Sequence, residues 1–203
     1  MNISPVIAWL DPLQKARLAS RFGLERHTCI DGQCPMRQPL VRVHDKTMLT
    51  ADMKRVVREQ RLGFVATVNR DGTPNVSPKA TFVVLDDSAI GFGDIRSPGT
   101  LRNLKSNPAV EVNFVDPFVR KGYRFAGTAA IIERGAPAFN DLLGRFEECG
   151  IAVSRLRALV KITVTKALPL ISPAYDRGVT ESELRRIFTT RFRTLQPNER
   201  FEE

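Results

Sequence analysis

The stretch that decides the fold is "LGFVATVNRDGTPNVSPKATFVVLDDSAIGFG", from Leu62 to Gly93. It contains two runs rich in β-branched and aromatic residues, separated by Asp71-Gly72, a dipeptide preferred in two-residue hairpin turns. A second turn signal, Asp86-Asp87-Ser88, leads into a third run. Since strands joined by such short turns run antiparallel, this stretch predicts a three-stranded antiparallel meander.

The flanking segments add further strands and helices. Residues 48–63 predict a helix that Thr50 caps, with Met53, Val56 and Val57 on one face. Further strands are expected in residues 109–116, 122–134 and 157–170, and further helices in residues 136–150 and 180–192, the last with a Thr180–Glu183 capping box. About six antiparallel strands with helices at their ends predict a mainly β fold, a closed or split barrel.

Composition bounds the class of protein. The chain has 203 residues, 42% of them hydrophobic, and no apolar run of membrane-spanning length. We expect no signal peptide, and three cysteines, an odd number, favour a reducing cytoplasm over a disulfide framework.

The charge distribution argues against a nucleic-acid partner. Of the net charge of +9, residues 1–47 carry +3 (seven basic, four acidic), residues 48–172 carry +6 (eighteen basic, twelve acidic) and residues 173–203 carry none (six of each). No block of like charge forms a binding arm, and few aromatic residues accompany the basic ones. A basic core of this kind equally suits an anionic cofactor or substrate.

The stretch "GFGDIRSPGTLRNLKSNP", from Gly91 to Pro108, reads as a strand end followed by a helix. Ser97 is a residue type that caps helix starts, and Pro98 suits the first helical position. Leu101 and Leu104 are spaced to share one buried face. Capping and packing alone are therefore sufficient to explain this stretch.

A second interpretation of the same helix start is an anion site. Arg96 precedes the cap, while Gly99 and Thr100 leave the first turn uncrowded. Free amides at the positive end of the helix dipole would then converge with a guanidinium and hydroxyl groups, which suits a phosphate. Lys79, on the neighbouring strand, is a second cation. The Gly-x-Gly at the strand end is not a dinucleotide fingerprint, because the third glycine and the parallel crossover are missing.

The run "LGFVATVNRDGTPNVSPKATFVVLDDSAIGFGDIRSPGTLRNLKSNPAVEVNFVDPFVRKGYRFAGTA", together with "ALPLISPAYD" further on, resembles the pyridoxamine 5'-phosphate oxidase-like family of FMN-binding split barrels. The resemblance covers about residues 48–175. It implies a six-stranded antiparallel split β-barrel that forms a homodimer, with FMN in a groove between the subunits. Residues 1–47 would then be an N-terminal extension, poorly ordered or peripheral, and residues 176–203 a C-terminal helical tail.

The resemblance also implies where the cofactor is held. In the family, basic and hydroxyl residues of the second and third strands and of the following short helix grip the FMN phosphate. Carried over to "SPKAT" and "DIRSPGT", these residues are Lys79, Thr81, Arg96, Ser97 and Thr100. Weaker positions, near the ribityl chain or the ring, are Ser77, Asp94 and Asn103.

The sequence departs from the family pattern at the elements that serve vitamin B6 oxidation. Authentic pyridoxamine phosphate oxidases carry a late Arg-x-His element and a late tryptophan beside the flavin. Here the histidines are His27 and His44 and the single tryptophan is Trp9, all upstream of the barrel. The resemblance therefore implies an FMN-dependent oxidoreductase acting on another small molecule, with NAD(P)H as a candidate electron donor.

A substrate contact can be suggested only from local chemistry. Tyr123, flanked by Arg120 and Arg124, would suit an anionic substrate or a reduced nicotinamide. In the alternative interpretation, Tyr123 packs in the sheet and the cations are solvated.

Several alternatives stay open on the same fold. This barrel type also serves F420-binding reductases and haem proteins, although no late histidine is available here as an axial ligand. A non-enzymatic flavin carrier is another alternative. No metal site is expected: His27, Cys29, Cys34 and His44 match no standard zinc spacing and read as loop residues.

Overall fold

The computed structural model describes residues 49–196, and the predictions for residues 1–47 and for the end of the C-terminal tail lie outside this range. The helices are α2 (Ala51–Gln60), α3 (Pro98–Ser106), α4 (Pro137–Glu148) and α5 (Glu181–Leu195), with short 3-10 turns at Val153–Arg155 and Tyr175–Arg177. The strands are β1 (Gly63–Val68), β2 (Pro74–Lys79), β3 (Phe82–Val84), β4 (Ala89–Asp94), β5 (Ala109–Asp116), β6 (Lys121–Glu133) and β7 (Ala158–Ile171).

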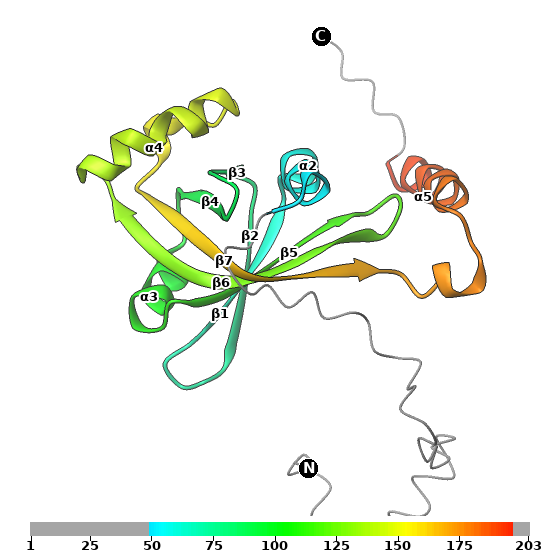
Figure 1. Cartoon of the computed structure of the whole chain (residues 1–203), viewed down its shortest axis with the longest axis horizontal. Coiled ribbons are helices and arrows are strands. Elements are labelled where there is room, and N and C mark those ends of the chain that lie inside the picture. Colours follow the sequence, from blue (N-terminus) through cyan, green and yellow to red (C-terminus); the bar gives the residue numbers. More distant parts are fainter. Residues whose placement is uncertain (1–48, 197–203) are drawn as a thin grey trace, which may run out of the picture. The chain divides into compact units, whose positions relative to one another are not determined.

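The strands form one curled antiparallel sheet in the order β2-β1-β5-β6-β7-β4-β3 (Figure 1). This confirms the split barrel, with seven strands in the described residues instead of the six expected. The additional strand arises because the run expected after the first turn is divided at Ala80 and Thr81. Its first part pairs with β1 at one edge of the sheet and its second part pairs with β4 at the other edge. The two edges of the sheet are thus consecutive in the chain.

Several local predictions are confirmed. Gly72 adopts a positive φ of 83° in the β1–β2 turn. The Thr50 side chain caps α2 by accepting a hydrogen bond from the Met53 amide, and the buried face of α2 is the one expected. The capping box of α5 is present in full, with Thr180 and Glu183 bonded to each other's backbone amides. These elements therefore follow from short-range sequence signals.

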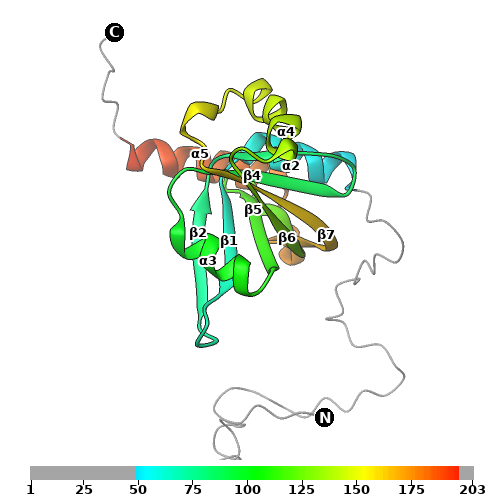
Figure 2. The ribbon, with the colours of Figure 1, turned by 90° about the vertical axis from the view of Figure 1, so that its left-hand side faces the viewer.

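The helices cover different parts of the sheet, as Figures 1 and 2 show. α2 packs against β3, β5 and β6, whereas α3 packs against β1 and β6 and α4 against β6. The main core, beneath α2, centres on Phe82, Phe92, Phe114 and Phe125. A second core, beneath α4, contains Phe139, Phe146, Leu156 and Leu159. Because the two cores lie on opposite sides of β4, this strand is buried along its whole length.

Candidate functional site

Four segments of the chain meet where the two edges of the curled sheet join. They are the end of β2, the start of β3, the end of β4 and the start of α3. The Thr81 hydroxyl donates a hydrogen bond of 2.6 Å to the Gly93 carbonyl, and the Gly93 amide donates one of 3.3 Å to the Thr81 carbonyl. These two bonds tie the start of β3 to the end of β4. We call this place, formed by residues 77–81 and 93–100, the seam corner.

Lys79 is the buried cation of the seam corner, with 8% of its surface exposed. Its ammonium donates a hydrogen bond to the Ser77 hydroxyl on the same strand. Burial lowers the pKa of Lys79, and the nearby charge of Asp94 acts in the opposite direction. No ion pair joins the two side chains. The ammonium also donates a 3.5 Å hydrogen bond to the Pro78 carbonyl, which leaves one of its three N–H donors for another acceptor.

Asp94 is the most unusual polar group in the seam corner. It is only 2% exposed, and its Oδ1 atom has no hydrogen-bond partner within the part of the chain that the structure describes. Its backbone carbonyl, in contrast, accepts a 2.7 Å bond from the Arg157 amide and fixes the strand. A buried carboxylate oxygen without a donor is costly unless something else supplies one.

The start of α3 is open. Ser97 occupies the N-cap position as expected, but its side chain makes no capping hydrogen bond. A Cβ atom added to Gly99 would meet nothing within 4 Å, so the first turn is open on the side of Gly99. Thr100 is buried, and Arg96 is exposed and makes no ion pair with any residue between 49 and 196. The first-turn amides are therefore left without a side-chain cap.

Thr81 and Asn103, two other residues expected at the cofactor, are engaged in holding the frame. The Thr81 hydroxyl donates its hydrogen bond to the Gly93 carbonyl. The Asn103 amide donates to the Thr67 hydroxyl at 3.1 Å and to the Asn69 side chain at 2.8 Å, which fastens α3 to β1. Thr81 lies in the seam corner, whereas Asn103 lies further along α3 and contacts the end of β1 near the β1–β2 turn, and the donors of both side chains are already used.

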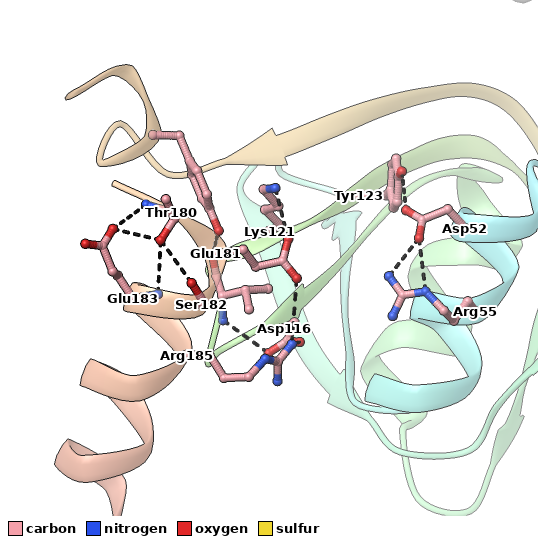
Figure 3. A network of polar contacts seen from close by, with 12 residues as sticks. Asp52, Arg55, Asp116, Lys121, Tyr123, Thr180, Glu181, Ser182, Glu183 and Arg185 are labelled. Atoms are coloured by element: carbon pink, nitrogen blue, oxygen red, sulfur yellow. Dashed lines mark hydrogen bonds and ion pairs between the residues drawn. The ribbon is translucent and has the colours of Figure 1, made fainter. Parts of the chain in front are cut away.

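Tyr123 lies in a different place, at a cavity of about 310 Å³ between α2, the β5–β6 turn and α5. Its hydroxyl donates a 2.6 Å hydrogen bond to Asp52, and Arg55 holds the same carboxylate at 2.7 Å, as Figure 3 shows. Burial, followed by the Asp52 contact, raises the pKa of Tyr123 to about 12. The hydrogen bonds from Tyr123 and Arg55 lower the pKa of Asp52. At neutral pH a neutral phenol thus faces a carboxylate, which disfavours an anion there.

The structure does not bring Arg120 and Arg124 together with Tyr123. Arg124 follows Tyr123 in a strand, so its side chain leaves from the opposite face and lies 3.7 Å from Glu111. Arg120, in the turn before β6, stacks on the Phe188 ring of α5 at 4.9 Å.

Sequence reasoning missed the polar network around the Tyr123 cavity. Lys121 pairs with Glu181 at 3.1 Å, and Arg185 pairs with Asp116 at 3.4 Å, so that two ion pairs fasten α5 to the β5–β6 hairpin (Figure 3). The acidic first turn of α5 and its basic second turn were the available signal. It could not be used because the partners lie 60 and 69 residues away along the chain.

The curled sheet and the open seam corner together define a split-barrel protein. The sequence profile of the pyridoxamine 5'-phosphate oxidase family matches residues 49–169, and the chain belongs to that family. Among solved structures, tagged HupZ of Group A Streptococcus is 34% identical, with a TM-score of 0.52 over 62% of this chain and 96% of the other.

Two further structures are more distant. A candidate pyridoxamine 5'-phosphate oxidase from Lactobacillus delbrueckii is 22% identical, with a TM-score of 0.52 over 61% of this chain and 96% of that one. An FMN-binding protein from Syntrophomonas wolfei is 15% identical, with a TM-score of 0.48 over 58% and 86% of the respective chains. No curated protein matches the chain.

Two negative findings concern residues 49–196 alone. No helix there is both long and apolar enough to cross a membrane. Within the same range, His, Cys, Asp and Glu side chains form no cluster of three that could hold a metal ion.

Proposed function

We propose that this protein is an FMN-dependent oxidoreductase that acts on a small molecule other than pyridoxamine phosphate. The observation that carries the proposal is the seam corner. It contains a buried lysine with a donor to spare, a buried carboxylate oxygen without a donor whose charge acts on that lysine, and an uncapped helix start four residues further along the chain. A ligand with a phosphate at one end and hydroxyl groups beside it supplies what each of these groups lacks.

The residues of the seam corner fit the phosphate and ribityl parts of FMN. Lys79 and Arg96 would balance the phosphate charge, and Ser97, Thr100 and the first amides of α3 would donate to its oxygens. Asp94 would accept a hydrogen bond from a ribityl hydroxyl, since a carboxylate repels phosphate but pairs with an alcohol. Ser77 orients Lys79, while Thr81 and Asn103 hold the frame. When bound, the flavin would supply hydride or electron transfer, and the protein would supply position and charge.

The test of this proposal is the ligand that co-purifies with the full chain. We expect a yellow protein with oxidised-flavin absorbance bands, a released ligand with the mass of FMN, and bleaching by NADH or NADPH under anaerobic conditions. A ligand with the mass of F420 would replace the proposal by an F420 reductase. FMN that resists every reductant would indicate a carrier, and a protein that neither contains nor takes up a flavin would refute the proposal.

We further propose that the protein is a homodimer formed through the outer face of β1, β2 and β5. Phe64 and Val76 on this face are 47% and 61% exposed, and Val68 and Val115 are also exposed. The strand register places Val76 opposite Ala66, and Phe64 opposite Asn113, so these side chains share one face. A contiguous apolar face of this kind favours a protein partner over water.

Replacing Phe64 by aspartate is expected to convert the dimer into a monomer. A carboxylate buried at the interface would be desolvated without a partner, which would weaken association by at least tenfold. Sedimentation velocity over a range of concentrations measures the change, with Ile187→Asp on α5 as the control at another exposed apolar residue. A wild-type chain that sediments as a monomer, or a Phe64→Asp variant that remains dimeric, would contradict the proposed interface.

A further inference from the structure

A cavity of about 470 Å³ lies between the end of α2, strand β3 and the end of α4. Three of its lining residues are arginines: Arg58 and Arg61 from α2 and its end, and Arg145 from α4. Glu148 is the one carboxylate among the lining residues, which otherwise are Cys149 and part of β3. We call this place the arginine cavity. Its lining shares no residue with the seam corner, so it does not depend on the proposed function.

The charges in the arginine cavity are not balanced internally. Among residues 49–196, neither Arg58 nor Arg145 has an ion-pair or side-chain hydrogen-bond partner, and Glu148 pairs with neither of them. Arg61 donates to the Cys149 carbonyl, so it covers the end of α4. Two guanidinium groups in the cavity are therefore free to bind a ligand.

The cavity beside Tyr123 provides a comparison within the same molecule. There Arg55, Lys121 and Arg185 also line one space, but each of them pairs with a carboxylate at 2.6 to 3.4 Å. Those cations are used to attach α5 and to hold Asp52. In the arginine cavity, three guanidinium charges face one carboxylate, leaving a formal excess of two positive charges.

We propose that the arginine cavity binds a small molecule that carries a diphosphate group. A guanidinium presents two parallel N–H donors that match adjacent phosphate oxygens, and an arginine keeps its charge at every physiological pH. Arg58 and Arg145 come from two different helices and would each bind one phosphoryl group, while Arg61 holds the end of α4 through the Cys149 carbonyl. The volume lies within the range of about 300–1,000 Å³ typical of small-molecule pockets, which leaves room for an organic part beyond the two phosphates.

The probe for this site is inorganic pyrophosphate, titrated into the full chain in a buffer free of phosphate. Calorimetry is expected to show saturable binding, and the arginine Nε–Hε signals of Arg58, Arg61 and Arg145 are expected to shift in NMR spectra. Arg145→Gln and Arg58→Gln should each weaken binding about tenfold, the loss of one charge-assisted contact. Arg58→Lys keeps the positive charge but loses the two parallel N–H donors of the guanidinium group. This variant should therefore bind pyrophosphate more tightly than Arg58→Gln but less tightly than the parent protein.

Two control variants make the result specific. Arg193→Gln removes an exposed arginine of α5 outside the cavity and should leave pyrophosphate affinity unchanged. Arg96→Gln tests the seam corner: loss of pyrophosphate binding in this variant, with binding retained in Arg145→Gln, would overturn the inference. The absence of saturable binding would also overturn it, as would malonate binding as tightly as pyrophosphate, since the latter result would indicate a carboxylate site.

Discussion

Replacing Lys79 by methionine is expected to weaken FMN binding about a hundredfold. The variant keeps most of the buried volume but removes a charged donor from a place where only 8% of the residue is exposed to water. A hydrogen bond to a charged group contributes about 1.5–3 kcal/mol, and each 1.4 kcal/mol corresponds to about a tenfold change in affinity. Quenching of flavin fluorescence on titration with protein measures the dissociation constant directly.

The pH dependence of FMN binding should identify the same residue. Because burial lowers the pKa of Lys79 from its ordinary 10.5, the ammonium of the free protein loses its proton at a lower pH than an exposed lysine does. A phosphate favours the protonated form, so FMN affinity should fall as the pH rises through the pKa of Lys79. The Lys79→Met variant should lack this decline.

Lys105 provides the matched control for this experiment. It lies on α3, is exposed, and forms a 2.9 Å ion pair with Glu133. Lys105→Met therefore removes one positive charge from α3 without touching the seam corner, and FMN affinity should change by less than about twofold. Equal losses in both variants would mean that only the net charge of the region matters. Unchanged affinity in Lys79→Met would remove the seam corner as the phosphate site.

Folding is not expected to limit the Lys79→Met experiment. Since the folded state lowers the pKa of Lys79, the protonated side chain is less favourable in the folded chain than in the unfolded one. This cost is present at neutral pH and disappears as the pH rises above the folded-state pKa. Methionine does not carry the charge and avoids the cost, so the melting temperature should stay within a few degrees of the parent value.

Replacing Gly122 by alanine is expected to destabilise the fold by about 3 kcal/mol or more. Gly122 lies in β6 opposite Val115 of β5, and a Cβ atom added there would stand 1.8 Å from the Phe114 carbonyl oxygen. Backbone cannot move aside as a flexible side chain can, so β5 and β6 would have to separate at their turn. For a chain of this size, such a loss should lower the melting temperature by about 10 °C.

Gly144 is the matched control for Gly122. It lies in the interior of α4, and an added Cβ atom would meet nothing within 4 Å. Gly144→Ala should stabilise the protein by about 0.5–1 kcal/mol, because alanine has less backbone freedom to lose in a helix. Thermal unfolding followed by circular dichroism measures both variants. A Gly122→Ala variant with the same melting temperature as the parent protein would contradict the close approach of β5 and β6.

The elements that the sequence predicted well depend on neighbours within a few residues. The Asp71-Gly72 turn, the Thr50 cap and the Thr180–Glu183 capping box are all set by backbone geometry and hydrogen bonds over three or four positions. Interactions between residues only a few positions apart can be predicted from a single sequence. For the same reason, the split barrel could be inferred from the spacing of its turns and from the family resemblance.

The features that could not be predicted depend on distant partners. Pro78 indicates an edge strand but does not fix a division at Ala80, which becomes clear only when one half of the run pairs with β1 and the other with β4. Similarly, an acid such as Asp52 in a first helical turn is explained by the helix dipole alone. Its bond to Tyr123, 71 residues away, requires the folded sheet.

The sheet closes in an unusual manner at Ala80 and Thr81. Its outermost strands, β2 and β3, are consecutive in the chain through these two residues, so a short peptide joins the two edges of the curled sheet. A ligand bound both to Lys79 at one edge of the sheet and to α3 beyond the other edge would hold the two edges together. Ligand binding would therefore stabilise this connection, and the ligand-bound protein should be more resistant to proteolysis at Ala80-Thr81 than the ligand-free protein.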